Sequence, residues 1–352
     1  MSLFALITAL LLEQLRPLSS RKYLFGWVSG YVKYFQHHFN GGQQHQGRIA
    51  WLLAVLPLLA GAMVLYQLLC QAHPIFAWAF NVLVLYLTMG FRQFSHYFTD
   101  IHQALRDNRL DEARRILSVW CGMPSHELNA EEVARVTIEQ ALIASHRHVF
   151  GVIVWFVLFS AAGLGGAAGA LLYRLSQFLC KQWGCENKAE PDSMEGREWD
   201  GGECEDHLIS PQAIRPSYQK PIVKSLVMSG HPFGRFARWA FYYLDWLPVR
   251  LTAMTFAIVG NFEDTVYCWR TQAASWPEPE AGIVLASGAG ALGVRLGMPI
   301  PLGGLPLDRP ELGAGEDADA DFMQSTIGLV WRSVVFWMIL LLLLTLASLP
   351  GL

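Results

Sequence analysis

The sequence predicts an all-α fold: a polytopic helical membrane protein with cytoplasmic amphipathic helices and long polar loops. Of its 352 residues, 53% are hydrophobic and only 16% are charged. Charged residues make up about a quarter of a typical soluble domain. The apolar residues are also clustered in runs long enough for a helix to cross about 30 Å of hydrocarbon. The chain is therefore expected to alternate between membrane helices and polar segments.

Six segments are predicted, with boundaries where the apolar runs begin and end. In chain order they are N-terminal membrane helices with a basic loop (1–91), a cytoplasmic helical segment (92–148), a Gly-rich membrane hairpin (149–180), an acidic, disordered loop (181–236), a membrane element followed by a Gly/Pro-rich segment (237–328), and a C-terminal membrane helix (329–352).

The N-terminal segment indicates how the chain is oriented. Residues 2–12 are apolar but contain no Lys or Arg, so they lack the basic region of a secretory signal and are predicted to be a retained first membrane helix. Residues 16–48 contain five basic residues and no acid, which favours the cytoplasm. Membrane runs follow at 49–69 and 74–91. The expected location is a bacterial inner membrane, crossed several times, with the lipid bilayer as a partner.

The second segment has the pattern of helices that pack on one face. Apolar residues recur at 110, 113, 116 and 117 after Asn108, and Asn129 precedes a second such pattern as an N-cap. The charges of both helices are expected to lie on a solvated face. His146-Arg147-His148 stands at the step into the next apolar run. Two interpretations of this triplet remain open: an anchor at the membrane interface, or part of an anion site.

The middle of the chain combines a glycine cluster with an acidic loop. Glycines at 163, 165, 166 and 169 either form the turn of a hairpin or are packing contacts within a single crossing. Residues 186–206 hold nine acids and few large apolar side chains, which predicts disorder.

Several functions are excluded by composition and spacing. A net charge of −3 provides no basic field, so we expect no nucleic-acid partner. Cys180, Cys185, Cys204 and His207 match no zinc spacing, and no metal site is predicted. The glycines of 288–293 fit no dinucleotide or phosphate-loop fingerprint. No cofactor can be assigned with certainty, and the sequence indicates no protein partner.

Two charges lie inside the apolar run 239–262, and they single out a candidate site. Asp245 and Arg250 are expensive to keep in such a place, which marks them as functional. In one interpretation they form an ion pair that fixes helix packing, with a kink at Pro248 bringing them together. In the other, Arg250 and further arginines hold a phosphate or carboxylate.

Several motifs resemble one known family. They are Pro279–Gly297, Phe233-Gly234 followed by Pro248–Ala253, Tyr173-Arg174, and Arg135–Glu139. Together they are similar to the CobD/CbiB family, the membrane-bound adenosylcobinamide-phosphate synthases of cobalamin biosynthesis. The resemblance covers most of 92–297. It implies a protein that joins a corrinoid carboxylate to an aminopropanol-type amine as an amide, with a corrinoid or a phosphorylated small molecule as ligand.

The family's acids and asparagines are replaced at several motif positions, which predicts little or no synthase activity. The replacements stand at 143, 144, 177, 180, 241, 242, 245, 280 and 285. Residues 1–4 and 244–251 resemble AmpE, a related inner-membrane protein tied to β-lactamase induction. The alternative function is therefore a non-catalytic, AmpE-like sensor or regulator of cell-wall signalling. No catalytic residue is assigned; the candidate ligand-binding residues are Glu139, Arg174, Asp245, Arg250 and Arg295.

Overall fold

The computed structural model describes residues 2–15, 21–39, 43–184, 232–302 and 305–347. Most of the predicted acidic loop, with Cys185, Cys204 and His207, lies outside the described residues. Four helices begin the chain: α1 (Ser2–Leu15), α2 (Arg21–Phe39), α3 (Gln44–Ala72) and α4 (Pro74–Thr88). The α3–α4 turn is closed by His73, whose ring accepts a hydrogen bond from the Ile75 backbone N–H at 3.2 Å.

The next three helices are α5 (Phe91–Arg106), α6 (Leu110–Cys121) and α7 (Ala130–Ser145). The predicted N-cap of α7 is confirmed, because the Asn129 side chain accepts from the Glu132 backbone N–H at 2.8 Å. Asn108 takes a left-handed φ of 57°, and Arg109 is the N-cap of α6 instead. The expected solvated face of α7 is wrong beyond its first turn, since every residue from Val133 to Ser145 is buried. This helix is central to the fold because neighbours cover it on all sides.

The chain continues from α7 through a π-helical turn, η1 (His146–Phe150), into α8 (Gly151–Ala161) and then α9 (Gly166–Gly184). Both roles considered for the glycines are present. Gly163 and Gly165 have φ of 73° and 90° in the turn between α8 and α9, where other residues would be strained. Gly169 faces α8 so closely that a Cβ there would meet the Trp155 carbonyl oxygen at 2.1 Å. The backbones of α8 and α9 are therefore packed closely together at this glycine.

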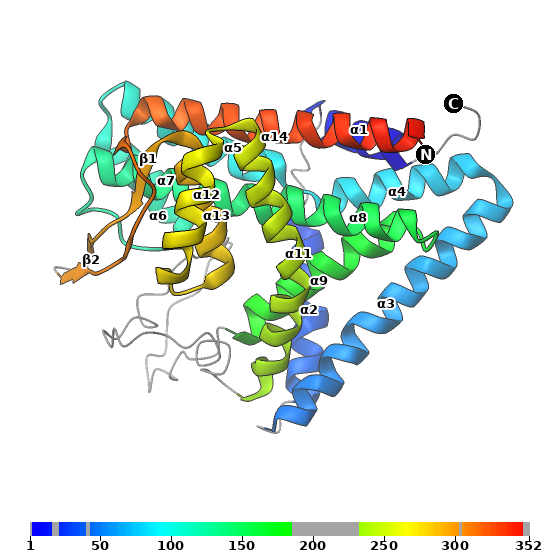
Figure 1. The fold of residues 1–352 in the computed structure, drawn as a ribbon. Helices are drawn as coiled ribbons and strands as arrows, with labels where there is room; N and C mark the ends of the chain where they lie inside the picture. Colours follow the sequence, from blue (N-terminus) through cyan, green and yellow to red (C-terminus); the bar gives the residue numbers. More distant parts are fainter. Residues whose placement is uncertain (1, 16–20, 40–42, 185–231, 303–304, 348–352) are drawn as a thin grey trace.

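After the undescribed stretch, the short 3-10 turn η2 (Pro232–Gly234) leads into the long helix α11 (Arg235–Val259). The helices α12 (Phe262–Gln272) and α13 (Pro279–Leu292) follow, separated by the 3-10 turn η3 (Ala273–Ser275). In Figure 1, α11 crosses in front of α8 and α9, with α12 and α13 beside it.

Short strands make the fold less purely helical than predicted. They are β1 (Val294–Gly297), β2 (Ile300–Leu302), β3 (Leu305–Leu307), β4 (Glu311–Leu312) and β5 (Glu316–Asp317). β1 pairs antiparallel with β4 and parallel with β5, while β2 and β3 form a small hairpin. Gly and Pro break this region into pieces too short to show a period-2 pattern in the sequence. The last helix, α14 (Ala320–Ala347), runs along one edge of the molecule (Figure 1).

Three helical stretches of the described chain are long and apolar enough to cross a membrane: 44–72, 130–161 and 320–347. Many large apolar side chains on α3 and α14 are exposed, among them Leu56, Leu68, Ile339 and Leu343. Such exposure is unfavourable in water and suits contact with lipid. The predicted run at 74–91 forms a shorter apolar helix, and α11 is not among the three candidates.

Candidate functional site

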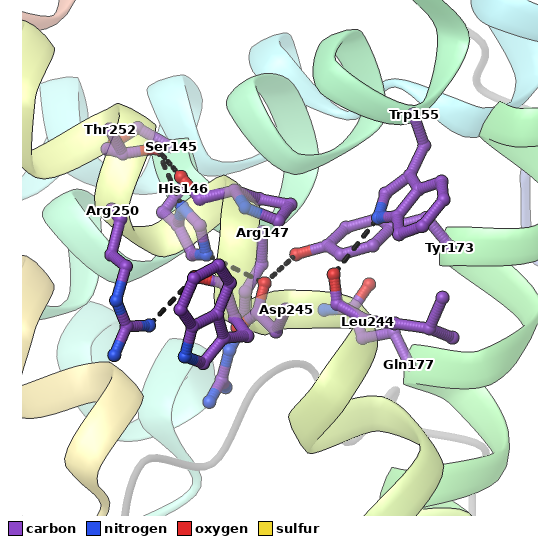
Figure 2. A network of polar contacts seen from close by, with 12 residues as sticks. Ser145, His146, Arg147, Trp155, Tyr173, Gln177, Leu244, Asp245, Arg250 and Thr252 are labelled. Atoms are coloured by element: carbon purple, nitrogen blue, oxygen red, sulfur yellow. Dashed lines mark hydrogen bonds and ion pairs between the residues drawn. The ribbon is translucent and has the colours of Figure 1, made fainter. Parts of the chain in front are cut away.

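A buried carboxylate lies at the centre of a polar network between η1, α9 and α11. Asp245 is only 2% exposed, and its Oδ1 atom accepts a hydrogen bond from the Tyr173 hydroxyl at 2.8 Å. The same oxygen lies 3.0 Å from Nε2 of His146. The other ring nitrogen of His146, Nδ1, lies 2.9 Å from the Thr252 hydroxyl. Figure 2 shows His146 and Tyr173 converging on Asp245 from different helices.

His146 is the first residue of the π-helical turn η1, which continues α7 into α8. A π turn inserts one extra residue into the helix and rotates the side chains that follow it, and such turns are frequent at functional sites. His146 is 2% exposed at the start of the turn, while Arg147 next to it remains partly exposed. The two interpretations of the His146–His148 triplet are therefore incomplete: His146 is neither an interfacial anchor nor exposed to an anion.

A close helix contact holds Tyr173 in the network. Gly151 at the start of α8 lies directly against the Tyr173 ring, and a Cβ at this glycine would meet the ring at 2.2 Å. Tyr173 itself is fully buried, so its hydroxyl needs a hydrogen-bond partner, which Asp245 supplies. The carboxylate is thus held by two groups whose positions depend on the packing of α8 against α9.

A second carboxyl lies at the rim of this network, in the first turn of α13. Glu280 is partly buried, and burial is the main reason that its pKa rises from 4.5 to about 7, with the charges of Asp245 and Glu278 acting in the same direction. The charge of Arg147 opposes this rise in the Glu280 pKa. Arg147 also lies 3.4 Å from Glu278, which brings its guanidinium to the same rim. A carboxyl that titrates near neutral pH can take and return a proton.

The predicted ion pair between Asp245 and Arg250 is not formed. Arg250 instead stacks its guanidinium over the Trp246 ring, 4.2 Å from the ring centre, and donates to the Trp246 carbonyl at 2.9 Å. Figure 2 shows the Arg250 guanidinium pointing away from Asp245. Five residues separate the two along α11, and the helix continues through Pro248 without bringing them together.

Two of the other candidate residues belong to a different place, around the strands. Glu139 on α7 accepts from Arg309 Nη1 at 2.7 Å and from the Gly297 backbone N–H at 2.7 Å. Arg295 on β1 forms an ion pair with Asp317 on β5 at 2.8 Å. The structure therefore divides the candidates between the Asp245 network and a cluster at the end of β1.

The remaining candidate, Arg174, follows Tyr173 on α9. Its guanidinium donates to the Gln177 side chain one turn further along the helix. Arg174 is thus next to the network in sequence, and its hydrogen bond to Gln177 runs along its own helix.

Comparison with known proteins shows to which family the chain belongs. The family model described as CobD/Cbib protein matches residues 3–190 and 230–330. The chain belongs to the CobD/CbiB family. It is 32% identical over 347 residues to the cobalamin biosynthesis protein CobD of Stutzerimonas stutzeri, covering 97% of this chain and 98% of the relative.

More distant relatives carry similar names. The chain is 32% identical to a CobD of Chromobacterium violaceum (82% of this chain, 76% of the relative) and 25% identical to the cobalamin biosynthesis protein CbiB of Salmonella typhimurium (81% and 77%). No solved structure matches the chain. The likeness to AmpE finds no support in these comparisons.

Sequence reasoning selected Asp245 in this CobD/CbiB chain but missed its partners. His146, Tyr173 and Glu280 all stand within or beside the stretches singled out by sequence. Their partnership is invisible there because His146 and Tyr173 are 99 and 72 residues away from Asp245. A histidine and a tyrosine in apolar surroundings are the signal that could have indicated a buried acid nearby.

Proposed function

We propose that this protein is a multi-pass inner-membrane protein of cobalamin biosynthesis that joins a corrinoid carboxylate to an aminopropanol-type amine, forming an amide at the Asp245–Glu280 site. Membership of the CobD/CbiB family supports the pathway. The observation that carries the site is Glu280, a carboxyl with a pKa of about 7, at the rim of the buried Asp245 network.

Amide formation from an amine requires a base, and Glu280 is suited to this role. An amine attacks only after losing a proton, and a base whose pKa lies near the working pH removes protons most effectively. The step starts from a carboxylate that a phosphoryl donor, such as a nucleoside triphosphate, has already converted to a phosphate anhydride. The new C–N bond forms as the C–O bond to phosphate breaks. Phosphate leaves, and the amine proton passes to Glu280.

Two arginines beside the site are suited to binding the activated carboxylate and its phosphate. Arg147 and Arg250 both present guanidinium groups near the site, and guanidinium binds carboxylate and phosphate oxygens in pairs. Arg250 is held by an aromatic ring rather than by an acid, so its charge stays available for a ligand. Asp245 is held in place by His146 and Tyr173, and its charge raises the pKa of Glu280.

This proposal replaces the expectation of an inactive protein. That expectation rested on the loss of acids at motif positions such as 143, 241 and 285. Glu280 stands where the family pattern has an asparagine, and it lies within electrostatic reach of Asp245. Asp245 and Glu280 are therefore two carboxyls that can replace part of the function of the missing family acids.

The test uses purified protein and a corrinoid acid. Corrinoid binding is followed by the visible spectrum, and amide formation by product analysis with an activated carboxylate and the amine. We expect Glu280→Gln to lower the amide-forming rate about a hundredfold or more and to retain the spectral shift on binding. Glu263→Gln, at an exposed position of α12, is the matched control with an unchanged rate. Equal rates in the two variants would remove Glu280 from the mechanism.

The membrane topology can be tested separately. In a cysteine-free background, single cysteines at the exposed positions Gln43 and His126 should resist a membrane-impermeant thiol reagent in intact cells, because both segments are proposed to be cytoplasmic. A cysteine at His73, exposed in the α3–α4 turn, should react. Labelling at His126 together with protection at His73 would reverse the proposed orientation.

A further inference from the structure

The cluster at the end of β1 contains more buried positive charge than its acid can balance. Arg135 and Arg309 are each 6% exposed, and Glu139, at 1%, is the buried acid between α7 and the strands. Both oxygens of Glu139 are already occupied. Oε2 accepts from Arg309 at 2.7 Å, and Oε1 accepts from the Gly297 backbone and, at 3.4 Å, from Arg309.

Arg135 has no oxygen acceptor in the described part of the chain. Its Nη1 atom lies 3.5 Å from the Met298 sulfur, and its Nε atom is buried without a hydrogen-bond partner. A thioether is a weak acceptor, and a buried guanidinium without an oxygen partner is unfavourable. The acids nearest to it besides Glu139 are used elsewhere: Glu132 accepts from the Asn129 backbone N–H, and Asp317 pairs with Arg295.

Met298 covers this guanidinium through an unusual backbone conformation. Its φ is 63°, in the left-handed region, and it follows Gly297 with φ 74°. A Cβ at Gly297 would meet the Pro310 carbonyl oxygen at 1.9 Å, and Arg309 Nε donates to the Met298 carbonyl at 3.1 Å. Strained backbone of this kind persists when its surroundings determine it, and it is frequent at ligand sites. The Met298 side chain is partly exposed and flexible, so it can move while its backbone stays fixed.

We propose that Arg135 forms a second, oxyanion-binding site, with the Met298 side chain as its movable cover. The ligand is a phosphate or carboxylate group that displaces the sulfur and binds the guanidinium through two oxygens. Eleven residues of helix separate Arg135 from His146, which is about 16 Å, so this site is distinct from the proposed amide-forming site. The inference does not depend on that proposed function.

Two sources could supply such an anion, and the experiment distinguishes them. Thermal unfolding of the full-length protein is measured in a neutral detergent with inorganic phosphate, and with sodium chloride at equal ionic strength. It is also measured in nanodiscs of phosphatidylglycerol and of phosphatidylcholine. A soluble ligand is indicated by stabilisation with phosphate, and a lipid headgroup by stabilisation with phosphatidylglycerol.

Four variants test the residues. Arg135→Met should abolish the stabilisation by the anion and, without anion, should unfold at or above the wild-type temperature, because no oxygen partner is lost. Met298→Ala should bind the anion about tenfold more tightly, since the cover is removed, and Met298→Leu should not gain affinity. Arg106→Met, at an exposed position of α5, should respond as wild type. No anion-specific stabilisation in either medium, or strong destabilisation by Arg135→Met without anion, would overturn the proposal.

Discussion

Asp245 and Glu139 are both almost completely buried, yet the protein satisfies them in opposite ways. Glu139 accepts from the Arg309 guanidinium and from the backbone N–H of Gly297, the last residue of β1. Asp245 faces a histidine ring and a tyrosine hydroxyl. The charge of Glu139 is thus matched by a guanidinium, whereas Asp245 is held by an aromatic nitrogen and a hydroxyl that belong to η1 and α9.

The difference indicates different roles. The Glu139–Arg309 pair joins α7 to the segment between β3 and β4, and Arg309 also donates to the Gly297 carbonyl at the end of β1, which together form a fixed structural link. The Asp245 network lies beside Glu280 and Arg147, which are partly exposed and can meet a ligand. A buried acid held by side chains from two other helical segments, next to a partly open rim with a carboxyl of raised pKa, is the arrangement suited to chemistry.

The largest expected effect is the loss of stability when the arginine partner of Glu139 is removed. Arg309→Met removes the guanidinium that donates to both oxygens of the buried Glu139 and leaves Oε2 without that donor, and we expect it to lower the free energy of unfolding by about 3–5 kcal/mol. Denaturant or thermal unfolding in detergent measures this loss. Arg109→Met removes an exposed arginine with its own ion pairs, and as the control it should change stability far less than Arg309→Met, because solvent screens exposed ion pairs. Similar losses in both variants would contradict the structural role of the Glu139–Arg309 pair.

The second effect concerns Glu280 and pH. Because its pKa is raised from 4.5 in the unfolded chain to about 7 in the folded protein, the folded state binds more protons between these values. Stability should therefore fall as the pH rises from about 5 to about 8, by about 2 kcal/mol after allowance for partial solvent screening. Glu280→Gln should remove this slope, as measured by unfolding temperature against pH. An identical slope in the variant would show that Glu280 titrates at its ordinary pKa.

The smallest effect concerns Arg250. Since it stacks on Trp246 and does not pair with Asp245, Arg250→Ala should cost only about 0.5–1 kcal/mol of stability. Thermal stability in detergent measures the change, with Arg250→Lys as the variant that keeps the charge. A loss as large as that of Arg309→Met would instead support the ion pair with Asp245 that the sequence suggested.

Local signals in the sequence predicted much of the helical structure. The cap at Asn129 and the left-handed glycines at 163 and 165 follow from residue type. The strands between 294 and 317 were missed because each is at most four residues long. The partners of Asp245 were missed because they come from other helical segments and meet it only through tertiary packing, such as the close Gly151–Tyr173 contact.

The most direct test of the proposed function is complementation of a bacterial strain that lacks its own CobD/CbiB protein. The strain is grown where it must make cobalamin from cobyric acid. Wild-type protein should restore growth, Glu263→Gln should restore it equally, and Glu280→Gln should not, with all three proteins present in the membrane at equal amounts. No growth with correctly inserted wild-type protein would contradict the synthase function, and full growth with Glu280→Gln would contradict the role of Glu280 as the base.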